Sequence, residues 1–244
     1  MAKRRVDALL VEKGLVESRE RAQAAILAGS VLAGQRPVAK PGTLVDEAAE
    51  LTLLASARYV SRGGEKLEHA LRAFALDVSG LAAADVGAST GGFTDCLLQH
   101  GAARVYSIDV GYGQLDYRLR RDPRVVVMER VNARYLEGLP ESADLATVDV
   151  SFISLEKVLP AVRKLLKPGA PIISLFKPQF QARREEVGRG GVIREPVLQA
   201  TLIGRFVAWT VGQGYRVRGL VRSPLLGPAG NAEFFVLLRP PSGG

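Results

Sequence analysis

From residue 82 onward, the sequence alternates between short apolar runs typical of strands and longer runs with helical periodicity. We expect strands at residues 83–86, 105–109, 125–128, 145–150, 171–176, 215–221 and 234–238. Helices are expected at residues 93–100, 115–121, 155–166 and 196–212. Alternation at this spacing predicts an α/β domain with a mostly parallel sheet covered on both faces. Only the last two strands, which no helix separates, are expected to form an antiparallel edge.

A glycine-rich turn joins the first of these strands to its helix, in the run Asp85-Val86-Gly87-Ala88-Ser89-Thr90-Gly91-Gly92-Phe93. Gly87 permits a tight turn, and Gly91 and Gly92 would let a ligand approach the main chain closely. A dinucleotide-binding turn would have glycine where Ser89 stands, and the run lacks the Lys-Ser/Thr ending of a P-loop. The turn therefore predicts a small-molecule site that suits neither NAD nor a nucleoside triphosphate. A purely structural glycine turn is the alternative.

The next two strands supply polar residues that suit a nucleoside. Asp109 ends the second strand, 24 residues after Asp85, where an acid can accept hydrogen bonds from a ribose. Asn132 follows the third strand and is a candidate contact for an adenine edge. A glycine turn without a pyrophosphate grip, together with a ribose-binding acid, suits S-adenosylmethionine. The candidate cofactor contacts are Asp85, Gly87, Ser89, Gly91, Gly92, Phe93, Asp109, Asn132 and Asp149.

Four ionisable residues lie at the edges of expected core elements, in the order Lys66, Asp149, Lys177 and Glu233. Lys66 is just inside a helix expected to begin at Glu65, and Glu233 precedes the last strand. Asp149 and Lys177 end the fourth and fifth strands, and ligands bind at the carboxyl ends of strands in open α/β sheets. A capping or surface role is the alternative for any one of them. Two lysines and two carboxylates at one end of a sheet nevertheless predict a reaction centre.

Residues 1–58 are expected to form a separate, small α+β domain. Helices are expected at residues 6–13 and 18–28, the second between Ser18 as N-cap and Gly29, with short strands at 31–32, 38 and 51–54. Residues 55–64, with small side chains and a glycine pair, are expected to be a linker. A solvated helix face with ordinary ion pairs is the alternative to a binding surface for the basic side chains of this domain. These are Arg4, Arg5, Arg19, Arg21, Arg36 and Lys40.

The composition bears on partners and on compartment. The net charge of +8 and the pI of about 9.9 fit nucleic acid first and an anionic membrane surface second. One cysteine excludes an internal disulfide, and two histidines make a structural zinc site improbable. No apolar run approaches the ~18 residues that span a bilayer, and no secretory signal follows the basic start. We therefore expect a cytoplasmic protein without membrane insertion.

The N-terminal pattern resembles the RNA-binding module first known in ribosomal protein S-four, through Val6-Asp7, Gly14-Leu15-Val16, Ser18-Arg19 and Pro41-Gly42. The ordered lysine–aspartate–lysine–glutamate set around a glycine turn resembles the FtsJ/RrmJ-type ribose 2′-O-methyltransferases. Residues 4–239 as a whole resemble the hemolysin A/TlyA family. The resemblance implies an RNA-binding domain at residues 1–58 and a linker at 59–64. It also implies a Rossmann-like class I methyltransferase domain, with a mostly parallel seven-stranded sheet, at residues 65–240.

The same resemblance implies the activity, which is S-adenosylmethionine-dependent 2′-O-methylation of cytidine in ribosomal RNA or ribosomal subunits. Lys177 is expected to lie closest to the 2′-hydroxyl, as a base or as a cation that stabilises the alkoxide. Asp149 would orient Lys177 and lie near the sulfonium, and Lys66 and Glu233 would position the ribose. No metal is required for this chemistry.

RNA contacts are expected from both domains, at Arg4, Arg5, Arg19, Arg21, Arg183, Arg184 and Arg189. The last three belong to a basic, glycine-rich loop at residues 181–194, which is expected to act as a mobile RNA clamp. A disordered surface connection is the alternative for this loop. Two other functions stay open, a membrane-active haemolysin and a non-catalytic RNA-binding ribosome-assembly factor.

Overall fold

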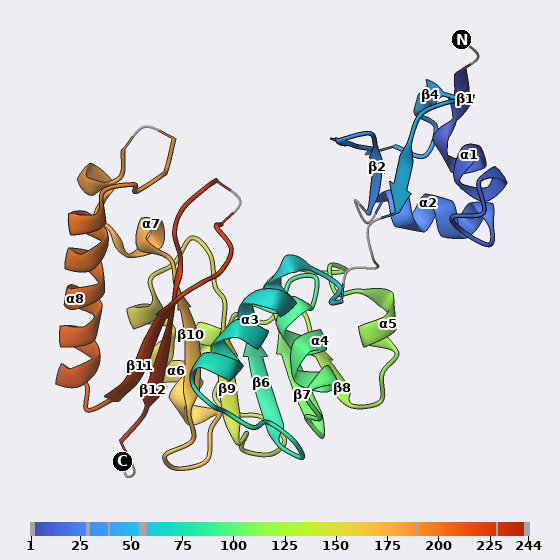
Figure 1. Cartoon of the computed structure of the whole chain (residues 1–244). Helices are drawn as coiled ribbons and strands as arrows, with labels where there is room; N and C mark the ends of the chain where they lie inside the picture. The colour runs from blue at the N-terminus through green and yellow to red at the C-terminus, as the bar shows by residue number, and fades with distance from the viewer. Residues whose placement is uncertain are drawn as a thin grey trace. The chain divides into compact units, whose positions relative to one another are not determined.

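The computed structural model describes residues 3–27, 30–38, 40–53, 58–188, 190–227 and 229–241. The chain folds into two compact units, one formed by residues 1–58 and the other by residues 59–244. The small unit is blue in Figure 1, and the large unit runs from teal to red. Each unit has a core of its own and is described separately below.

Among its described residues, the small unit has two helices, α1 (Val6–Glu12) and α2 (Arg19–Leu27), that pack against each other. The strands β2 (Val31–Ala33), β3 (Arg36–Pro37) and β5 (Leu51–Leu53) form an antiparallel sheet in the order β3-β2-β5. Both helices and this sheet bury apolar side chains together. The buried core consists of Val6, Leu9, Leu10, Ala22, Ile26, Val31, Val38 and Leu51.

A second, two-stranded sheet in the small unit has no counterpart among the expected strands. β1 (Lys3–Arg5) pairs antiparallel with β4 (Leu44–Asp46). β1 consists of three basic residues and lacks the apolar alternation by which a strand is recognised in a sequence. It pairs with β4 through its main chain, which does not depend on the side chains. The expected cap Gly29, the strand residue Leu54 and the linker residues 55–57 lie outside the described residues.

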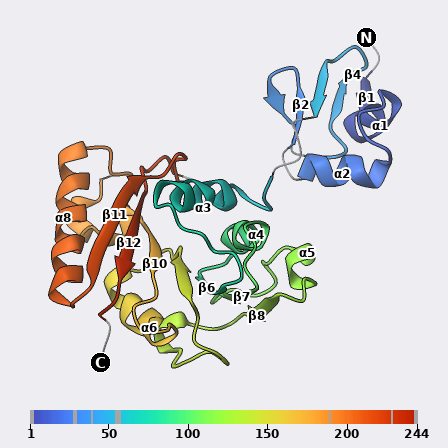
Figure 2. The same ribbon diagram turned by 60° about the horizontal axis from the view of Figure 1, so that its bottom comes forward.

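A seven-stranded sheet forms the centre of the large unit, in the order β11-β12-β10-β9-β6-β7-β8 (Figures 1 and 2). Its parallel strands are β6 (Ala82–Val86), β7 (Arg104–Ile108), β8 (Val125–Met128), β9 (Leu145–Val148) and β10 (Ile172–Phe176). The remaining strands are β11 (Arg216–Arg222) and β12 (Phe234–Arg239). The expected α/β class with a mostly parallel sheet is confirmed.

Helices cover both faces of this sheet. The longer ones are α3 (Arg62–Ala73), α4 (Gly92–Gln99), α6 (Leu159–Lys164) and α8 (Pro196–Gly212). Successive strand residues point to opposite faces, so Ala83 and Val105 join a core beneath α3 and α4, whereas Ala84 and Tyr106 join a core beneath α6 and α8. Figure 2 shows α3 and α4 above the strands and α6 below them. Burial on both faces explains why the parallel strands are mostly apolar, whereas the edge strand β11 alternates with exposed arginines.

Strand β12 lies inside the sheet rather than at its edge. It pairs antiparallel with β10 on one side and with β11 on the other, so β11 is the edge strand. The expected antiparallel pairing of the last two strands is confirmed, but their order in the sheet differs from a simple antiparallel edge. The crossover through α8 makes β11 run parallel to β10 with a gap between them, and the chain then returns to fill that gap with β12.

Helix α3 begins at Arg62, three residues before the expected start. The Ser61 hydroxyl caps it by accepting a hydrogen bond from the Gly63 main-chain N–H at 3.3 Å. Tyr59 is only 2% exposed, and a Cβ at Gly64 would lie 2.1 Å from its ring. Residues 59–64 are therefore packed into the large unit and do not form the expected linker.

The remaining helical segments are short. They are α5 (Tyr117–Arg120), α7 (Pro178–Gln181) and the 3-10 turns η1 (Ala133–Tyr135), η2 (Leu155–Lys157) and η3 (Arg184–Glu186). The helix expected at residues 155–166 is divided into η2 and α6, because Pro160 occupies the first turn of α6 and cannot continue a preceding helix.

Candidate active site

The loops that follow four adjacent strands, β9, β6, β7 and β8, border one cavity of about 510 Å³. This volume falls in the range of roughly 300–1,000 Å³ that is usual for small-molecule sites. Five of the expected cofactor contacts line the cavity, namely Gly87, Ser89, Asp109, Asn132 and Asp149. The strand ends therefore bring these polar groups around one small-molecule-sized space.

The main chain holds the acidic residue of this cavity in place. Asp109 Oδ2 accepts a hydrogen bond from the Ser89 N–H at 2.8 Å, and Oδ1 accepts one from the Gly111 N–H at 2.7 Å. A carboxylate can accept about four hydrogen bonds, so both oxygens keep capacity for ribose hydroxyls. Asn132 uses its side-chain oxygen to accept from the Arg134 N–H at 3.1 Å, and its amide NH₂ group can donate to a base edge.

The second half of the glycine turn serves the packing of the protein itself. A Cβ at Gly91 would lie 2.3 Å from Leu119 Cδ1, and one at Gly92 would lie 2.2 Å from Ser61 Oγ. Phe93 is buried in the core beneath α4. None of these three expected contacts lines the 510 Å³ cavity, although Gly92 and Phe93 line a smaller one described below. Glycine is required at positions 91 and 92 because neighbouring side chains occupy the space that a Cβ would need.

Asp85 also lies away from the cavity, fully buried in β6. Its Oδ2 accepts a hydrogen bond from Thr94 Oγ1 at 2.7 Å, and its Oδ1 accepts one from Thr147 Oγ1 at 2.9 Å. The expected contact with the cofactor does not hold, because the carboxylate links β6, β9 and α4 inside the core. Burial raises the pKa of Asp85 to about 6, although the two threonine hydrogen bonds oppose the rise.

We expect Asp85→Asn to remove a pH dependence of stability. The pKa of Asp85 is raised from 3.8 to about 6 on folding, so its ionisation costs nothing below pH 4 and the full amount above pH 6. A shift of about two units corresponds to roughly 3 kcal/mol. Relative to wild type, the variant should therefore gain about that much unfolding free energy between pH 4 and pH 7. Urea unfolding at both pH values measures this gain, and an equal difference between the two proteins at each pH would contradict it.

The four ionisable residues expected at the reaction centre form two ion pairs. Lys66 Nζ lies 2.6 Å from Glu233 Oε2, and Lys177 Nζ lies 2.5 Å from Asp149 Oδ1. Both lysines are 8% exposed, and Glu233 is 1% exposed. Charges removed from water to this degree need partners, and each of these lysines has a carboxylate. The pairing leaves the group close to electrically neutral.

Sheet register explains how Glu233 reaches this end of the molecule. Phe234 of β12 pairs with Phe176 of β10, so the residue before β12 and the residue after β10 lie at the same edge of the sheet. That edge also carries Asp149 after β9. Glu233 is therefore delivered by the start of an antiparallel strand to the place where the parallel strands end.

A smaller cavity, of about 210 Å³, connects Lys66 with the cofactor turn. Gly87, Ser89 and Asp149 line both this cavity and the larger one, and Lys66 and Gly92 line only the smaller one. A molecule in the larger cavity would thus lie against Asp149, with Lys66 on the far side. This arrangement suits transfer of a group from a bound donor to a second substrate.

Comparison with known proteins identifies the fold family of both units. Residues 59–240 match the FtsJ-like methyltransferase family, and residues 4–51 match the S4 domain. The chain belongs to the FtsJ-like methyltransferase family. It is thus a methyltransferase that uses S-adenosylmethionine, and its large unit is the methyltransferase domain.

Named relatives extend over both domains. The chain is 48% identical over 99% of its length to "Putative rRNA methyltransferase YqxC" of Bacillus subtilis, covering 88% of that protein. It is 47% identical over 98% of its length to the 16S/23S rRNA (cytidine-2′-O)-methyltransferase TlyA of Mycobacterium tuberculosis, covering 91% of that protein. A solved structure, "Putative hemolysin from Streptococcus thermophilus", matches all of this chain and 90% of its own, with 44% identity and a TM-score of 0.77.

The methyltransferase domain also places Ser151 beside Lys177 and Phe152 beside Phe180. Ser151 Oγ accepts a hydrogen bond from Lys177 Nζ at 3.0 Å. Phe152 is 91% exposed at φ 63°, and its ring lies 5.0 Å from that of Phe180. Both residues lie within three positions after Asp149 in the sequence, so their position after a strand end was the available signal. A large exposed aromatic side chain in a left-handed backbone conformation is uncommon.

The structure separates the expected RNA contacts of the S4 domain into distinct groups. Arg5 and Arg19 both bind Asp7, at 2.8 Å and 3.1 Å. Arg4 instead pairs with Glu12, and Arg21 pairs with Glu17 at 3.5 Å. All four arginines are therefore engaged with carboxylates, but only two share one.

In the methyltransferase domain, Arg183 and Arg184 are exposed at the start of the expected clamp, and Arg189 lies outside the described residues. Glu186 accepts a hydrogen bond from the Arg183 N–H at 2.8 Å and pairs with Arg205 at 2.6 Å, which fixes this part of the loop to α8. At its far end, the loop is held by Asn231, whose side chain bonds the main chain of Ile193 and Gly191.

Within the described ranges, no group of three or more histidine, cysteine, aspartate or glutamate side chains could hold a metal ion. Nor does any helix among the described residues have both the length and the apolar character needed to cross a membrane.

Proposed function

We propose that this protein methylates a ribose 2′-hydroxyl of ribosomal RNA, on a cytidine. The ion pair between buried Lys177 and partly buried Asp149, which lines the 510 Å³ cavity, carries the proposal. The pair would place a cation and a carboxylate beside the methyl donor. A ribose hydroxyl is a weak nucleophile and needs a neighbouring base or charge to activate it. Relatives at 47–48% identity are named as rRNA methyltransferases, and one of them carries the cytidine-2′-O designation.

The chain's own residues would hold the methyl donor at the strand ends. Asp109 would accept hydrogen bonds from its ribose, and Asn132 would contact its adenine. Asp149 would lie near the sulfonium, since it lines both cavities. Bound S-adenosylmethionine supplies an electrophilic methyl group, so no metal is needed for the transfer.

The two ion pairs would prepare the acceptor hydroxyl. Lys177 Nζ is held by Asp149 and by Ser151, which fixes its direction. As an ammonium it would donate a hydrogen bond to the 2′-oxygen and stabilise the negative charge that develops there. As an amine it would take the hydroxyl proton. Lys66, fixed by Glu233, would position the ribose from the opposite side.

A groove beside this centre would receive the nucleotide that carries the acceptor ribose. Its volume is about 700 Å³, and Phe152, Phe180, Arg134 and Lys157 line it. Aromatic faces stack on unpaired bases, and basic side chains meet the phosphates. The groove therefore suits an unpaired nucleotide, which fits the general preference of RNA-binding proteins for splayed-out bases.

Phe152→Ala should weaken RNA methylation more than cofactor binding, although Phe152 lines the 510 Å³ cavity as well as the groove. Stacking on one aromatic ring contributes ~1–3 kcal/mol, so we expect kcat/KM for RNA to fall by roughly 5- to 150-fold. Steady-state methyl transfer measures kcat/KM, and calorimetry measures cofactor affinity. Phe152→Tyr, which keeps a ring, is the control. Equal activity of the alanine and tyrosine variants would contradict stacking.

RNA docking would involve both domains. The S4 domain would bind a structured part of the RNA through Arg5 and Arg19, with Arg4 and Arg21 nearby in sequence. Arg183 and Arg184 would contact phosphates near the reaction centre, and a flatter salt dependence of binding is expected when they are neutralised. A ribosomal substrate would place the protein in the cytoplasm.

Transfer of tritiated methyl from S-adenosylmethionine to purified ribosomal subunits that lack the modification tests the function. We expect label in RNA, recovered as an alkali-resistant 2′-O-methyl dinucleotide. Label elsewhere in the RNA would refute ribose methylation. Cofactor binding without label on either subunit or on naked rRNA would refute a ribosomal substrate. RNA binding without any cofactor binding would favour the assembly-factor alternative, and calcein release from anionic vesicles would favour the haemolysin alternative.

A further inference from the structure

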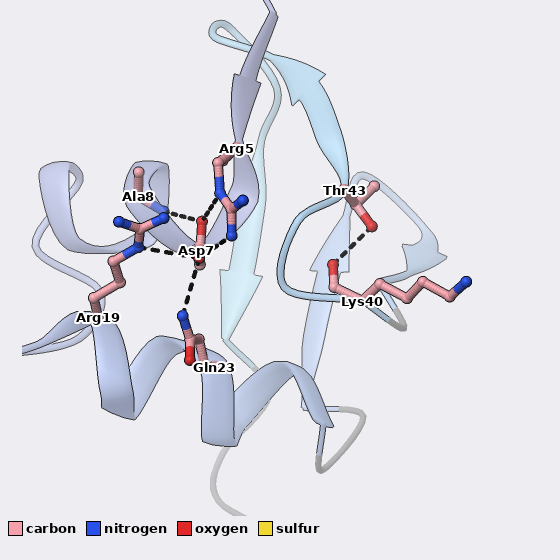
Figure 3. Close-up of polar contacts among 7 residues, drawn as sticks. All are labelled: Arg5, Asp7, Ala8, Arg19, Gln23, Lys40 and Thr43. Atoms are coloured by element: carbon pink, nitrogen blue, oxygen red, sulfur yellow. Dashed lines mark hydrogen bonds and ion pairs between the residues drawn. The ribbon is translucent and has the colours of Figure 1, made fainter.

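A carboxylate is fully buried in the S4 domain, beside the two arginines that share it (Figure 3). Asp7 lies in the first turn of α1. Its Oδ1 accepts hydrogen bonds from Arg5 Nε at 3.0 Å and from the Ala8 N–H at 2.9 Å. Its Oδ2 accepts from Arg5 Nη2 at 2.8 Å, Arg19 Nε at 3.1 Å and Gln23 Nε2 at 3.3 Å. Five donors from β1, α1 and α2 thus converge on one carboxylate.

The charge of Asp7 is therefore firmly held. Hydrogen bonds from Arg5, and then from Gln23 and Arg19, keep the pKa of Asp7 well below its usual range, although burial opposes this. The carboxylate stays ionised at every pH at which the protein would act. Asp7 is thus a fixed anchor for the two guanidinium groups rather than a titrating group.

Both arginines keep donors that Asp7 does not use. Arg5 gives Nε and Nη2 to Asp7, which leaves Nη1, and Arg19 gives only Nε, which leaves both terminal nitrogens. The side chains are 48% and 52% exposed, so both arginines reach the surface of the domain. Within the part of the chain that the structure describes, neither guanidinium has a second carboxylate partner.

The position of Arg5 is also fixed from the other side. A Cβ at Gly42 would lie 3.6 Å from Arg5 Nη1, so the guanidinium rests against the turn at residues 40–43. That turn is closed by a hydrogen bond from Thr43 Oγ1 to the Lys40 carbonyl at 2.7 Å, and it is joined to α1 by one from the Val6 N–H to the Thr43 carbonyl at 2.9 Å. Figure 3 shows Arg5 and Arg19 on two sides of Asp7.

Two guanidinium groups and one carboxylate carry a net charge of +1, with several N–H groups left for an acceptor. A phosphodiester has two terminal oxygens that accept such forked donors. Because the side chains are already ordered, binding would lose less conformational entropy than it would with free arginines. We propose that Arg5 and Arg19 form a phosphodiester site for RNA and that Asp7 is its positioning residue. This inference rests on the proposed RNA substrate.

The sign of a charge change separates positioning from simple attraction. Asp7→Asn raises the net charge of the protein by one. If the domain bound RNA only through its overall charge, affinity would rise. If Asp7 positions the arginines, affinity falls, because an asparagine NH₂ group would repel one of the two guanidinium groups that the carboxylate now holds.

Binding of the full-length protein to purified ribosomal subunits, followed over a series of salt concentrations, tests the proposal. We expect Asp7→Asn to weaken binding by roughly 5- to 30-fold, the equivalent of one or two ordinary hydrogen bonds. Glu17→Gln is the matched control, because it removes an 80% exposed carboxylate from the same domain. It should leave binding unchanged or slightly tighter. Unchanged or tighter binding by Asp7→Asn, in a folded domain, would overturn the proposal.

A second variant keeps the test decisive if Asp7→Asn fails to fold. Arg5→Lys/Arg19→Lys keeps both charges but loses the forks. It should weaken binding about as much as Asp7→Asn, and adding Asp7→Asn to it should cause little further loss. Wild-type affinity in the lysine pair would overturn the phosphodiester site. If the wild-type protein itself neither bound nor methylated the subunits, the proposed function would be refuted. That outcome differs from a failure of the phosphodiester site, in which the wild-type protein binds and the variants bind equally well.

Discussion

Replacing Lys177 with methionine should lower the rate of methyl transfer by roughly 10²- to 10⁴-fold, the usual range for a group that exchanges a proton or stabilises charge at the reacting oxygen. Methionine has nearly the same length, so it should fill the space between Asp149 and Phe180. Binding of S-adenosylmethionine should persist, because Asp109 and Asn132 are untouched. Single-turnover methylation and calorimetry measure the two effects separately.

Two further lysine variants sharpen this result. Lys177→Arg keeps a permanent cation that does not act as a base. Partial activity would indicate that the cation stabilises the alkoxide, whereas inactivity equal to that of methionine would indicate a base. Lys164→Met, at an exposed lysine of α6, is the control for the loss of one positive charge and should behave as wild type. Normal turnover by Lys177→Met would remove this residue from the reaction centre.

Replacing Gly87 with alanine should destabilise the methyltransferase domain and abolish cofactor binding. Gly87 has φ 86°, and a Cβ there would lie 2.4 Å from the main-chain oxygen of Asp149. Main chain cannot move aside as a side chain can, so the turn would separate from the end of β9. Unfavourable φ costs ~1–3 kcal/mol, and overpacking costs a similar ~1–3 kcal/mol. Thermal unfolding and calorimetry with S-adenosylmethionine measure the two losses.

Gly80 provides the matched control for this substitution. It has φ 71°, and nothing lies within 4 Å of the position of its Cβ. Gly80→Ala should therefore carry only the backbone cost of positive φ and leave the cofactor site intact. If Gly80→Ala and Gly87→Ala lost the same stability and both bound cofactor normally, the close approach of Gly87 to Asp149 would have no importance.

The sheet could be predicted because its strands are short, continuous apolar runs, and such runs depend little on neighbours far away in the chain. The place of β12 could not be predicted in this way. Its sequence fits an edge strand as well as a central strand, and only the crossover through α8 makes room for it beside β10. The place of Glu233 before the last strand makes it a candidate for the reaction centre, but periodicity does not predict its pairing with Lys66.

The site residues divide along a similar line. Gly87, Asp109 and Asn132 line the cavity as expected from their places after strands. Asp85 and Gly91 come from the same stretch of sequence but face the core. This could not be predicted, because residue type alone does not distinguish an acid that contacts a ligand from one that accepts hydrogen bonds from two threonines. The role of Ser151 could not be predicted from the sequence, because a serine after a strand is common and only its distance from Lys177 shows that it binds this lysine.

The insertion of β12 between β10 and β11 has a consequence for how the enzyme is made. Lys66 and Glu233 are 167 residues apart, and β12 follows every other strand of the sheet in chain order. During synthesis, the open flank of β10 must wait for this strand while the rest of the sheet can already assemble. The Lys66–Glu233 ion pair is therefore completed last, whereas Asp149 and Lys177 precede β12 in the chain and can pair before this strand is added.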